Sequence, residues 1–274
     1  MADSFSLLDL LPEGARILDL GARLGSFSTL RTDLCIVRLD LDPPAGSGSR
    51  VRGDAAQLPF RAASFDLIVS NHSLEHFAEL ERTIREIGRV VKPDGVLYVA
   101  VPDAGTLTDH IYRWLGRGGG HVNAFRNPSD VIQPIERWTP LRHRSTTLLY
   151  SSLCFLNARN HSPNGAGRRQ RKLVFFANGN ERFLGWLVWA LRGIDRAMGT
   201  RCSVYGWSFR FGNVPPETHE PWMNVCIRCG SGAAEAFLRH SGAVFRGPGG
   251  IEKYYCPNCS APNLLTTGPP CAQA

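Results

Sequence analysis

The stretch ILDLGARLGSF (residues 17–27) decides how this chain is interpreted. A run of apolar residues contains Asp19, and Gly21 and Gly25 then bracket a short turn. A strand that runs into a glycine turn exposes backbone N–H groups, and glycine lets a ligand approach the backbone closely. The stretch therefore predicts a buried strand followed by a ligand-binding turn.

Apolar runs and helix-like segments alternate from residue 15 to residue 102. The runs 15–21, 34–42, 51–53, 65–71 and 96–102 read as strands. Residues 26–32 (SFSTLRT) suit a short helix, and residues 79–91 show apolar positions three to four apart. Pro93-Asp94-Gly95 is expected to end that second helix. The alternation predicts an α/β fold, a doubly wound, Rossmann-like and mostly parallel sheet with helices on both faces.

The second half of the chain is harder to interpret. Residues 145–156, 172–178 and 203–212 look like strands, and residues 180–199 have helical spacing. Pro215-Pro216 suggests a boundary. We expect a main domain over 1–215, with core motifs at 13–103 and a substrate or lid region at 104–200. A cysteine module at 216–264 and a flexible tail at 265–274 would follow.

The net charge of +7 is unevenly distributed. Residues 1–110 carry 11 Lys+Arg and 16 Asp+Glu, whereas residues 111–274 carry 20 and 8. A basic half is typical of proteins that bind anionic partners, such as RNA or a membrane surface. A solvated surface without such a partner explains it equally well. No apolar run of about 18 residues occurs, and no secretory signal is apparent, so a cytoplasmic protein without a transmembrane segment is expected. The two tryptophans of helix 180–199 leave peripheral membrane contact open.

Four of the eight cysteines form two closely spaced pairs. Cys226 and Cys229 make one C-x2-C knuckle, and Cys256 and Cys259 make the other. Four thiolates complete a tetrahedral zinc shell, and a small module needs such a staple because its core is small. The spacing predicts a structural zinc ribbon, which would serve as a structural cover, contact a dimer partner or dock RNA or protein.

Five stretches together resemble the class I S-adenosylmethionine-dependent methyltransferases. They are ILDLGARLGSFS, LCIVRLDLD, RGDAAQLPF, SFDLIVSNHSLEHF and REIGRVVKPDGVLYVAVP, in this order over residues 13–103. The resemblance covers over a third of the chain. It implies S-adenosylmethionine as cofactor, beside Zn²⁺ for the ribbon.

The resemblance also implies where that cofactor binds. Residues matching Asp19, Gly21 and Gly25 surround its methionine part in the family. The match to Asp40 binds the ribose, with Asp42 as the less favoured substitute. The remaining implied contacts are Asp54 and Ala55 to the adenine and Asn71 near the amino-acid portion.

Arg23 departs from the family pattern, which usually has glycine there. Either the loop has ordinary backbone angles with the arginine pointing away, or the site no longer holds the cofactor. We expect the former, because the other motifs are intact.

Three histidines are candidates for the chemistry. His72 and His76 follow the fourth strand, at the sheet edge where α/β proteins bind ligands. His121 follows three glycines that would let a lid move. An oxygen nucleophile often needs a base, which any of the three would supply. The alternative is that His76 packs beneath a helix, Glu75 caps or pairs on the surface, and His121 lies in solvent.

We therefore predict a methyltransferase acting on a small molecule, such as a sugar or lipid-linked glycan. The rival is an enzyme acting on RNA or protein, docked by the ribbon and the basic half. A non-catalytic cofactor-binding scaffold is the third reading. The acceptor atom and the oligomeric state do not follow from the sequence.

Overall fold

The structure is a computed structural model that describes residues 6–23, 25–27, 29–43, 49–116, 120–157, 181–216 and 222–268. The chain divides into two compact units. The first unit comprises Met1–Ala104, Gly120–Thr147 and Gly206–Thr218, and the second comprises Gly105–Gly119, Leu148–Tyr205 and His219–Ala274. This division groups part of the predicted lid region with the cysteine-rich segment instead of setting that segment apart.

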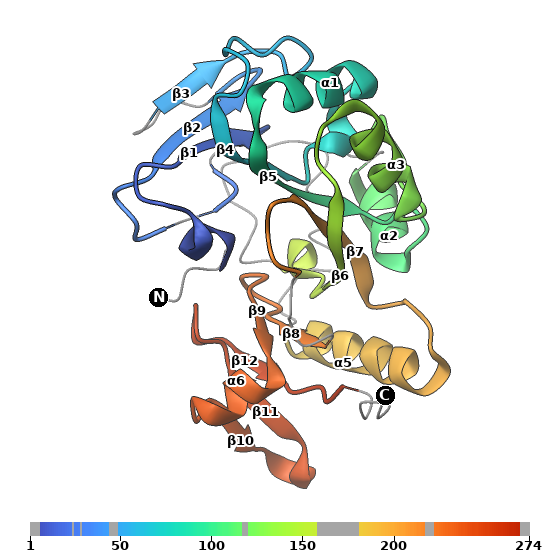
Figure 1. Cartoon of the computed structure of the whole chain (residues 1–274). Coiled ribbons are helices and arrows are strands. Elements are labelled where there is room, and N and C mark those ends of the chain that lie inside the picture. The colour runs from blue at the N-terminus through green and yellow to red at the C-terminus, as the bar shows by residue number, and fades with distance from the viewer. Residues whose placement is uncertain are drawn as a thin grey trace. The chain divides into compact units, whose positions relative to one another are not determined.

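A seven-stranded sheet with the order β3-β2-β1-β4-β5-β7-β6 organises the fold (Figure 1). Strands β1 to β5 pair in parallel, and β7 pairs antiparallel with β5. The mostly parallel α/β sheet is thus confirmed. Its strands are β1 (Arg16–Leu20), β2 (Cys35–Asp40), β3 (Ser49–Arg52), β4 (Phe65–Asn71), β5 (Val91–Pro102), β6 (His143–Tyr150) and β7 (Val204–Gly212).

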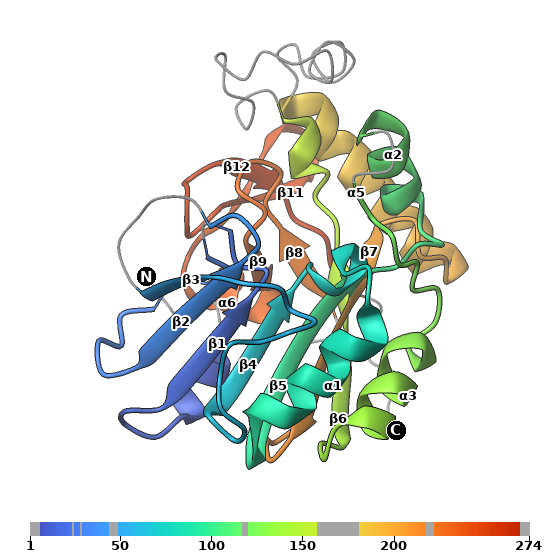
Figure 2. The ribbon, with the colours of Figure 1, turned by 90° about the horizontal axis from the view of Figure 1, so that it is seen from above.

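The central strands are apolar because both of their faces are covered. Helix α1 (Leu80–Val90) buries Ile84, Ile87 and Val90, and it lies with α3 (Ser129–Trp138) on one face of the sheet (Figure 2). The other face carries a cluster that includes Ile17, Leu67, Val69 and Val96. The 3-10 helix η1 (Ser6–Leu10) contributes Leu7 and Leu8 to that cluster.

Two sequence expectations about local elements differ from the structure. No helix forms among the described residues of 26–32; instead Phe27 packs as loop into the cluster behind β1. The described part of the first unit therefore covers that face with η1 and loop rather than with an α-helix. Helix α1 ends at Val90 as expected, but β5 begins at once with Val91, so Pro93-Asp94-Gly95 lies inside the strand.

The second unit contains the expected long helix and the cysteine-rich segment. Helix α5 (Glu181–Met198) confirms the helix predicted at 180–199, and α2 (Leu107–Gly116) lies in the same unit. The predicted strand at 172–178 lies outside the described residues. The remaining elements are η2 (Leu74–His76) in the first unit and η3 (Cys154–Leu156), β8 (Met223–Val225), β9 (Gly232–Ala234), α6 (Glu235–His240), β10 (Val244–Arg246), η5 (Pro248–Gly250), β11 (Glu252–Tyr255) and β12 (Pro262–Leu264) in the second.

The cysteine-rich segment packs within its unit through specific contacts. Arg228 forms a two-pronged ion pair with Glu181 at the start of α5, both N···O distances being 2.8 Å. The buried Asn157 donates to the carbonyl of Ile227 at 2.9 Å. Leu265 and Thr266 are also buried, and Thr266 bonds to Asn224, so packed structure continues past residue 264. None of the helices in the described ranges is long and apolar enough to cross a membrane.

Candidate cofactor and active site

The strand order creates a ligand crevice at one point of the sheet. The chain runs outward from β1 to β2 and β3, then returns to the other side of β1 with β4 and β5. In open parallel sheets, ligands bind at the carboxyl ends of the strands where the order reverses. The loops that follow β1 and β4 meet here, and they border an open cavity of about 780 Å³, lined by Gly21, Ala22, Arg23, Gly25, Ser26, Asp42, Asn71 and His72.

The two glycines of the turn are required for different contacts. Gly21 has a φ of +70°, and a Cβ there would lie 2.5 Å from the Cβ of Ser73. Gly25 has a φ of +116°, and its Cβ would lie 2.9 Å from Nε of Arg38. L side chains rarely adopt such φ values, so both positions need glycine for conformation and for space. Ser73 was missed by the sequence interpretation: its hydroxyl donates to the Leu20 carbonyl at 2.9 Å and so ties the β4 loop to β1.

Asp19 is a fully buried carboxylate under the turn. Its Oδ2 accepts from the backbone N–H of Ser26 at 2.9 Å and lies 3.7 Å from Nε of Arg38. Burial raises the pKa of Asp19, against the hydrogen bond from Ser26 and the charge of Arg38. Within the described residues no hydrogen-bond partner reaches its Oδ1. A buried acceptor with spare capacity beside an open glycine turn fits a ligand that carries N–H or O–H donors.

The backbone around Arg23 differs from the expectation of ordinary angles. Arg23 has a φ of +40°, in the left-handed region. Its N–H donates to Oδ2 of Asp40 at 2.9 Å, and its carbonyl accepts from Arg50 at 2.7 Å. The side chain is exposed, and Arg23 stands in the wall of a cavity that remains open. The alternative that the site no longer holds the cofactor therefore gains no support from the position of Arg23.

The acids predicted to hold the ribose and adenine divide into two kinds. Both carboxylate oxygens of Asp40 accept hydrogen bonds from the protein backbone. Oδ2 accepts from the N–H of Arg23, and Oδ1 accepts from the N–H of Asp42 at 3.1 Å. Asp42, the less favoured choice, lines the cavity. Asp54 is exposed and caps its own turn by accepting from the N–H of Ala56 at 2.9 Å, while Ala55 is buried. Neither Asp54 nor Ala55 lines the cavity, so their contact with adenine stays a prediction.

The structure brings the three predicted histidines together with Glu75. His72 lines the cavity, and its Nδ1 lies 3.8 Å from Oε1 of the buried Glu75. The rings of His76 and His121 meet edge to face at a centroid distance of 4.9 Å. Burial, followed by the neighbouring rings of His121 and His76, lowers the pKa of His72 to about 4. A surface role for Glu75 is wrong, since its side chain is only 1% exposed.

The backbone of His72 is also unusual. Its φ is +52°, and its N–H donates to the carbonyl of Ala100 on β5 at 2.9 Å. Non-glycine residues in this region cost free energy and often occur at functional sites. Here the conformation turns the chain sharply after Asn71, at the end of β4, so that both residues face the cavity.

The four paired cysteines converge in the second unit. Their sulfur atoms all lie within 4.8 Å of one another. Cys226 Sγ lies 3.7 Å from Cys259 Sγ, and Cys229 Sγ lies 3.6 Å from Cys256 Sγ. Four sulfurs at about 2.3 Å from a tetrahedral zinc are about 3.8 Å apart, so the donor set fits this metal.

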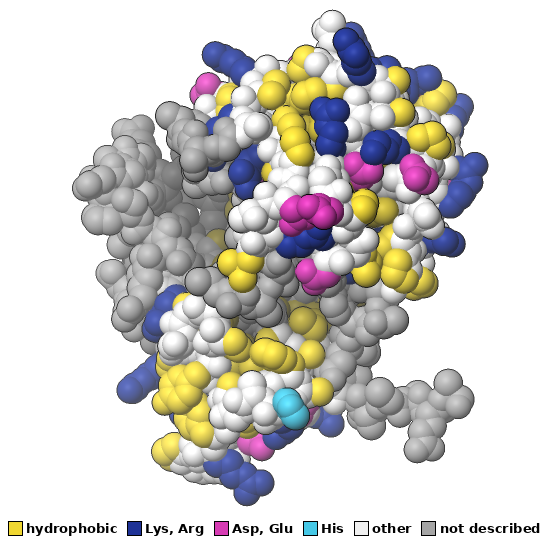
Figure 3. Space-filling model, turned by 60° about the vertical axis from the view of Figure 1, so that its left-hand side comes forward, with side chains coloured by type: hydrophobic (Ala, Val, Ile, Leu, Met, Phe, Trp, Pro, Cys, Tyr) yellow, Lys and Arg dark blue, Asp and Glu magenta, His cyan; other side chains and the backbone are white. Residues whose placement is uncertain are grey.

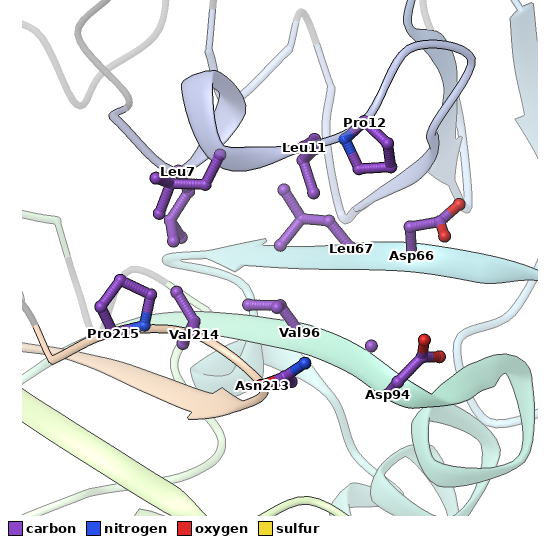
Figure 4. Close-up of a pocket in the computed structure, with 12 residues that line it drawn as sticks. Leu7, Leu11, Pro12, Asp66, Leu67, Asp94, Val96, Asn213, Val214 and Pro215 are labelled. Carbon is purple, nitrogen blue, oxygen red and sulfur yellow. The ribbon is translucent and has the colours of Figure 1, made fainter.

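A second cavity lies at the opposite end of β4 (Figure 4). Its volume is about 380 Å³, and side chains such as Leu7, Leu67 and Val214 line it. Asp66 at its edge is held by Lys92 at 2.6 Å and by the N–H of Arg16 at 2.9 Å. This cavity has the carboxylates of Asp66 and Asp94 in its lining but no glycine turn, so the first cavity is the candidate cofactor site.

Comparison with known proteins bears on the same region. Residues 18–99 match a family model described as "Methyltransferase domain". A malonyl-[acyl-carrier protein] O-methyltransferase of Methylococcus capsulatus is 34% identical over 181 residues, which are 56% of this chain and 66% of that protein. The biotin biosynthesis bifunctional protein of Cellvibrio japonicus is 29% identical over 146 residues, 48% of this chain and 29% of its own length.

A solved structure is also similar. It is a putative methyltransferase from Bacillus halodurans, 16% identical, with a TM-score of 0.48 over 78% of this chain and 100% of its own. This chain spans only part of each curated relative named above. The matched residues, 18–99, include the glycine turn, β4 and the first histidines. Over residues 18–99 the chain therefore matches the methyltransferase domain family.

Proposed function

We propose that this chain transfers a methyl group from S-adenosylmethionine to a small-molecule acceptor. The observation that carries the proposal is the open cavity where the loops after β1 and β4 meet, with the buried Asp19 beneath its glycine turn. Its volume lies within the range of about 300–1,000 Å³ that is usual for small-ligand sites.

The residues present would hold the cofactor in a defined way. The turn at Gly21 and Gly25, with Asp19 below it, suits the methionine part, and Asn71 suits the adjoining amino-acid portion. Asp42 is better placed for the ribose than Asp40, because Asp40 is engaged by the backbone of Arg23 and Asp42. When bound, the cofactor supplies an electrophilic methyl group on a sulfonium.

The chain's own contribution to transfer is chiefly orientation. We place the acceptor beside His72, because this is the histidine that lines the cavity. Proximity and alignment of two bound reactants account for a large part of the rate of such displacements. His76 and His121 lie near His72 and are the remaining candidates for removing a proton from an acceptor hydroxyl.

The relatives named for quinones favour a small acceptor, whereas malonyl-[acyl-carrier protein] is an acyl group carried on a protein. One relative is named for methylating malonyl-[acyl-carrier protein], and others for ubiquinone and demethylmenaquinone. A sugar or lipid-linked glycan stays our prediction for this chain.

RNA or protein as the acceptor has less support. On the face shown in Figure 3, the described Lys and Arg side chains are dispersed among acidic and hydrophobic ones. Several of the described arginines of the second unit are in ion pairs, including Arg113, Arg228 and Arg239. We also propose that Cys226, Cys229, Cys256 and Cys259 bind a structural zinc ion.

Cofactor binding and turnover test the proposal separately. Calorimetric titration of the full chain with S-adenosylmethionine should show one binding site, weakened by Asp42→Asn and by Gly21→Ala. Incubation with methyl-labelled cofactor and fractionated cell extract should label a small-molecule fraction. Absence of binding at high protein concentration would favour a degenerate, non-catalytic domain, and label in RNA or protein would overturn the acceptor class.

A further inference from the structure

The side chains of Glu75, His76 and His121 form a compact group of ligand atoms. One oxygen of Glu75 and one nitrogen from each histidine lie within 4.8 Å of one another. Two imidazoles and one carboxylate are a common ligand set for divalent transition metals. We propose that these three residues bind a divalent cation at the edge of the cofactor cavity, separate from the four-cysteine site.

The orientation of His76 is fixed by a backbone carbonyl. Its Nδ1 lies 3.0 Å from the carbonyl oxygen of Gly120. A carbonyl only accepts hydrogen bonds, so Nδ1 carries the proton and Nε2 of the neutral ring keeps its lone pair. Histidine ligands of metals usually donate their other ring N–H in this manner.

The segment that carries His121 is held against Glu75 by its own backbone. The carbonyl of Glu75 accepts from the N–H of Val122 at 2.8 Å and from the N–H of Asn123 at 3.0 Å. The Asn123 side chain donates to the carbonyls of Leu74 and Phe77 at 2.9 and 2.8 Å. Residues 44 to 49 positions apart in sequence are thus held together by five hydrogen bonds, counting that of His76, and the site is preformed.

Burial of Glu75 is the second reason for a cation. Its side chain is 1% exposed, and a buried carboxylate is costly unless a positive charge compensates it. A divalent ion at the point where the three ligand atoms converge would add positive charge beside this carboxylate, which also lies 3.8 Å from Nδ1 of His72.

The ligand chemistry favours Zn²⁺, Co²⁺, Ni²⁺ or Mn²⁺ over Mg²⁺, which prefers oxygen ligands. Three protein ligands leave coordination positions open, in contrast to the closed four-cysteine shell. If the proposed function holds, the open positions would bind an oxygen atom of the acceptor near His72. The acceptor class would then be a molecule that offers a hydroxyl or enol oxygen as a metal ligand.

Metal content of the full chain tests the site without any activity measurement. The chain would be saturated with zinc, passed through a desalting column with a weak chelator, and analysed by mass spectrometry for zinc per chain. The wild type should hold one zinc more than His121→Ala and one more than His76→Ala. His240→Ala changes an exposed histidine of α6 and should match the wild type.

The difference between variants decides the outcome, because it does not depend on whether the cysteines hold zinc. Equal zinc in the wild type and in both cluster variants would overturn the proposal. Circular dichroism melting would verify that each variant is folded, and His121→Gln serves where the alanine variant is not. Cofactor titration on the same samples separates the two hypotheses: zinc loss in the variants with no cofactor binding by the wild type refutes only the proposed function.

Discussion

Two motifs of the chain are stabilised by different amounts of surrounding structure. They are the glycine turn at residues 17–27 and the cysteine segment at residues 222–268. Strand β1 beneath the turn is buried from Ile17 to Leu20 and pairs on both sides. The cysteine segment has strands of three or four residues and a small cluster formed by Leu238, Tyr254 and Leu265.

The difference concerns what keeps each site in shape. The turn is held by a large sheet, so it exists without its ligand. The cysteine segment has short strands and a small apolar cluster of its own, so the proposed zinc ion is expected to contribute to its stability. Removal of the cofactor should therefore leave the glycine turn folded, whereas removal of the zinc ion should unfold the cysteine segment.

The largest effect is expected from Cys256→Ser. Structural zinc in small modules contributes about 10–16 kcal/mol of binding free energy, so loss of one thiolate should unfold residues 222–268. Limited proteolysis should cut this segment in the variant and spare it in the wild type. Cys35→Ser, which changes an exposed cysteine outside the cluster, is the matched control. A variant as protease-resistant as the wild type would refute metal dependence of the segment.

Gly21→Ala should have the next largest effect, on the turn. The backbone at φ +70° disfavours alanine by about 1–2 kcal/mol, and the new Cβ would overlap Ser73 at 2.5 Å. Gly14→Ala is a matched control, because Gly14 has a φ of +73° and nothing within 4 Å of its Cβ. Urea unfolding should show a clearly larger loss for Gly21→Ala than for Gly14→Ala. Equal losses would show that contact with Ser73 is unimportant.

Both motifs could be predicted from the sequence, because each is formed by residues that are close together along the chain. The strands from 15 to 102 follow from apolar runs, and the cysteine spacing predicts the convergence of the four sulfurs. The helix expected at 26–32 failed because Phe27 is used as a core side chain in a loop, which periodicity over seven residues does not reveal. Short amphipathic windows are ambiguous in this way.

Contacts between distant segments could not be predicted. His121 meets Glu75 and His76 only because backbone hydrogen bonds pin residues 120–123 to η2. Likewise, the choice between Asp40 and Asp42 depends on Arg23, whose left-handed backbone brings its N–H to Asp40. Neither arrangement has a spacing signal in the sequence.

The two acids after β2 offer a sharper test of the turn. Asp42→Asn should lower cofactor affinity about tenfold, the value of one charge-assisted hydrogen bond, with little change in melting temperature. Asp40→Asn should instead lower the melting temperature, because Asp40 accepts from two backbone N–H groups of the chain. Calorimetric titration and thermal melting on both variants distinguish these roles. If Asp40→Asn lowered the cofactor affinity and Asp42→Asn lowered the melting temperature, Asp40 would be the residue that binds the ribose.

The smallest expected effect concerns how the cysteine segment is attached to α5. The Glu181–Arg228 pair is two-pronged, and its side chains are 26% and 25% exposed, so it should contribute about 1 kcal/mol, at the upper end for partly exposed pairs. A double-mutant cycle with Glu181→Gln and Arg228→Gln, read by urea unfolding, isolates that coupling.

Arg239–Glu252 is the control pair, since it lies wholly inside the cysteine segment and is more exposed, at 41% and 28%. If α5 and the segment unfold together, both couplings appear in one transition; if the segment unfolds first, the Glu181–Arg228 coupling appears only in that earlier step. A coupling near zero for Glu181–Arg228 would mean that the apolar contacts around Ile227 and Leu184, rather than this ion pair, hold the segment to the helix.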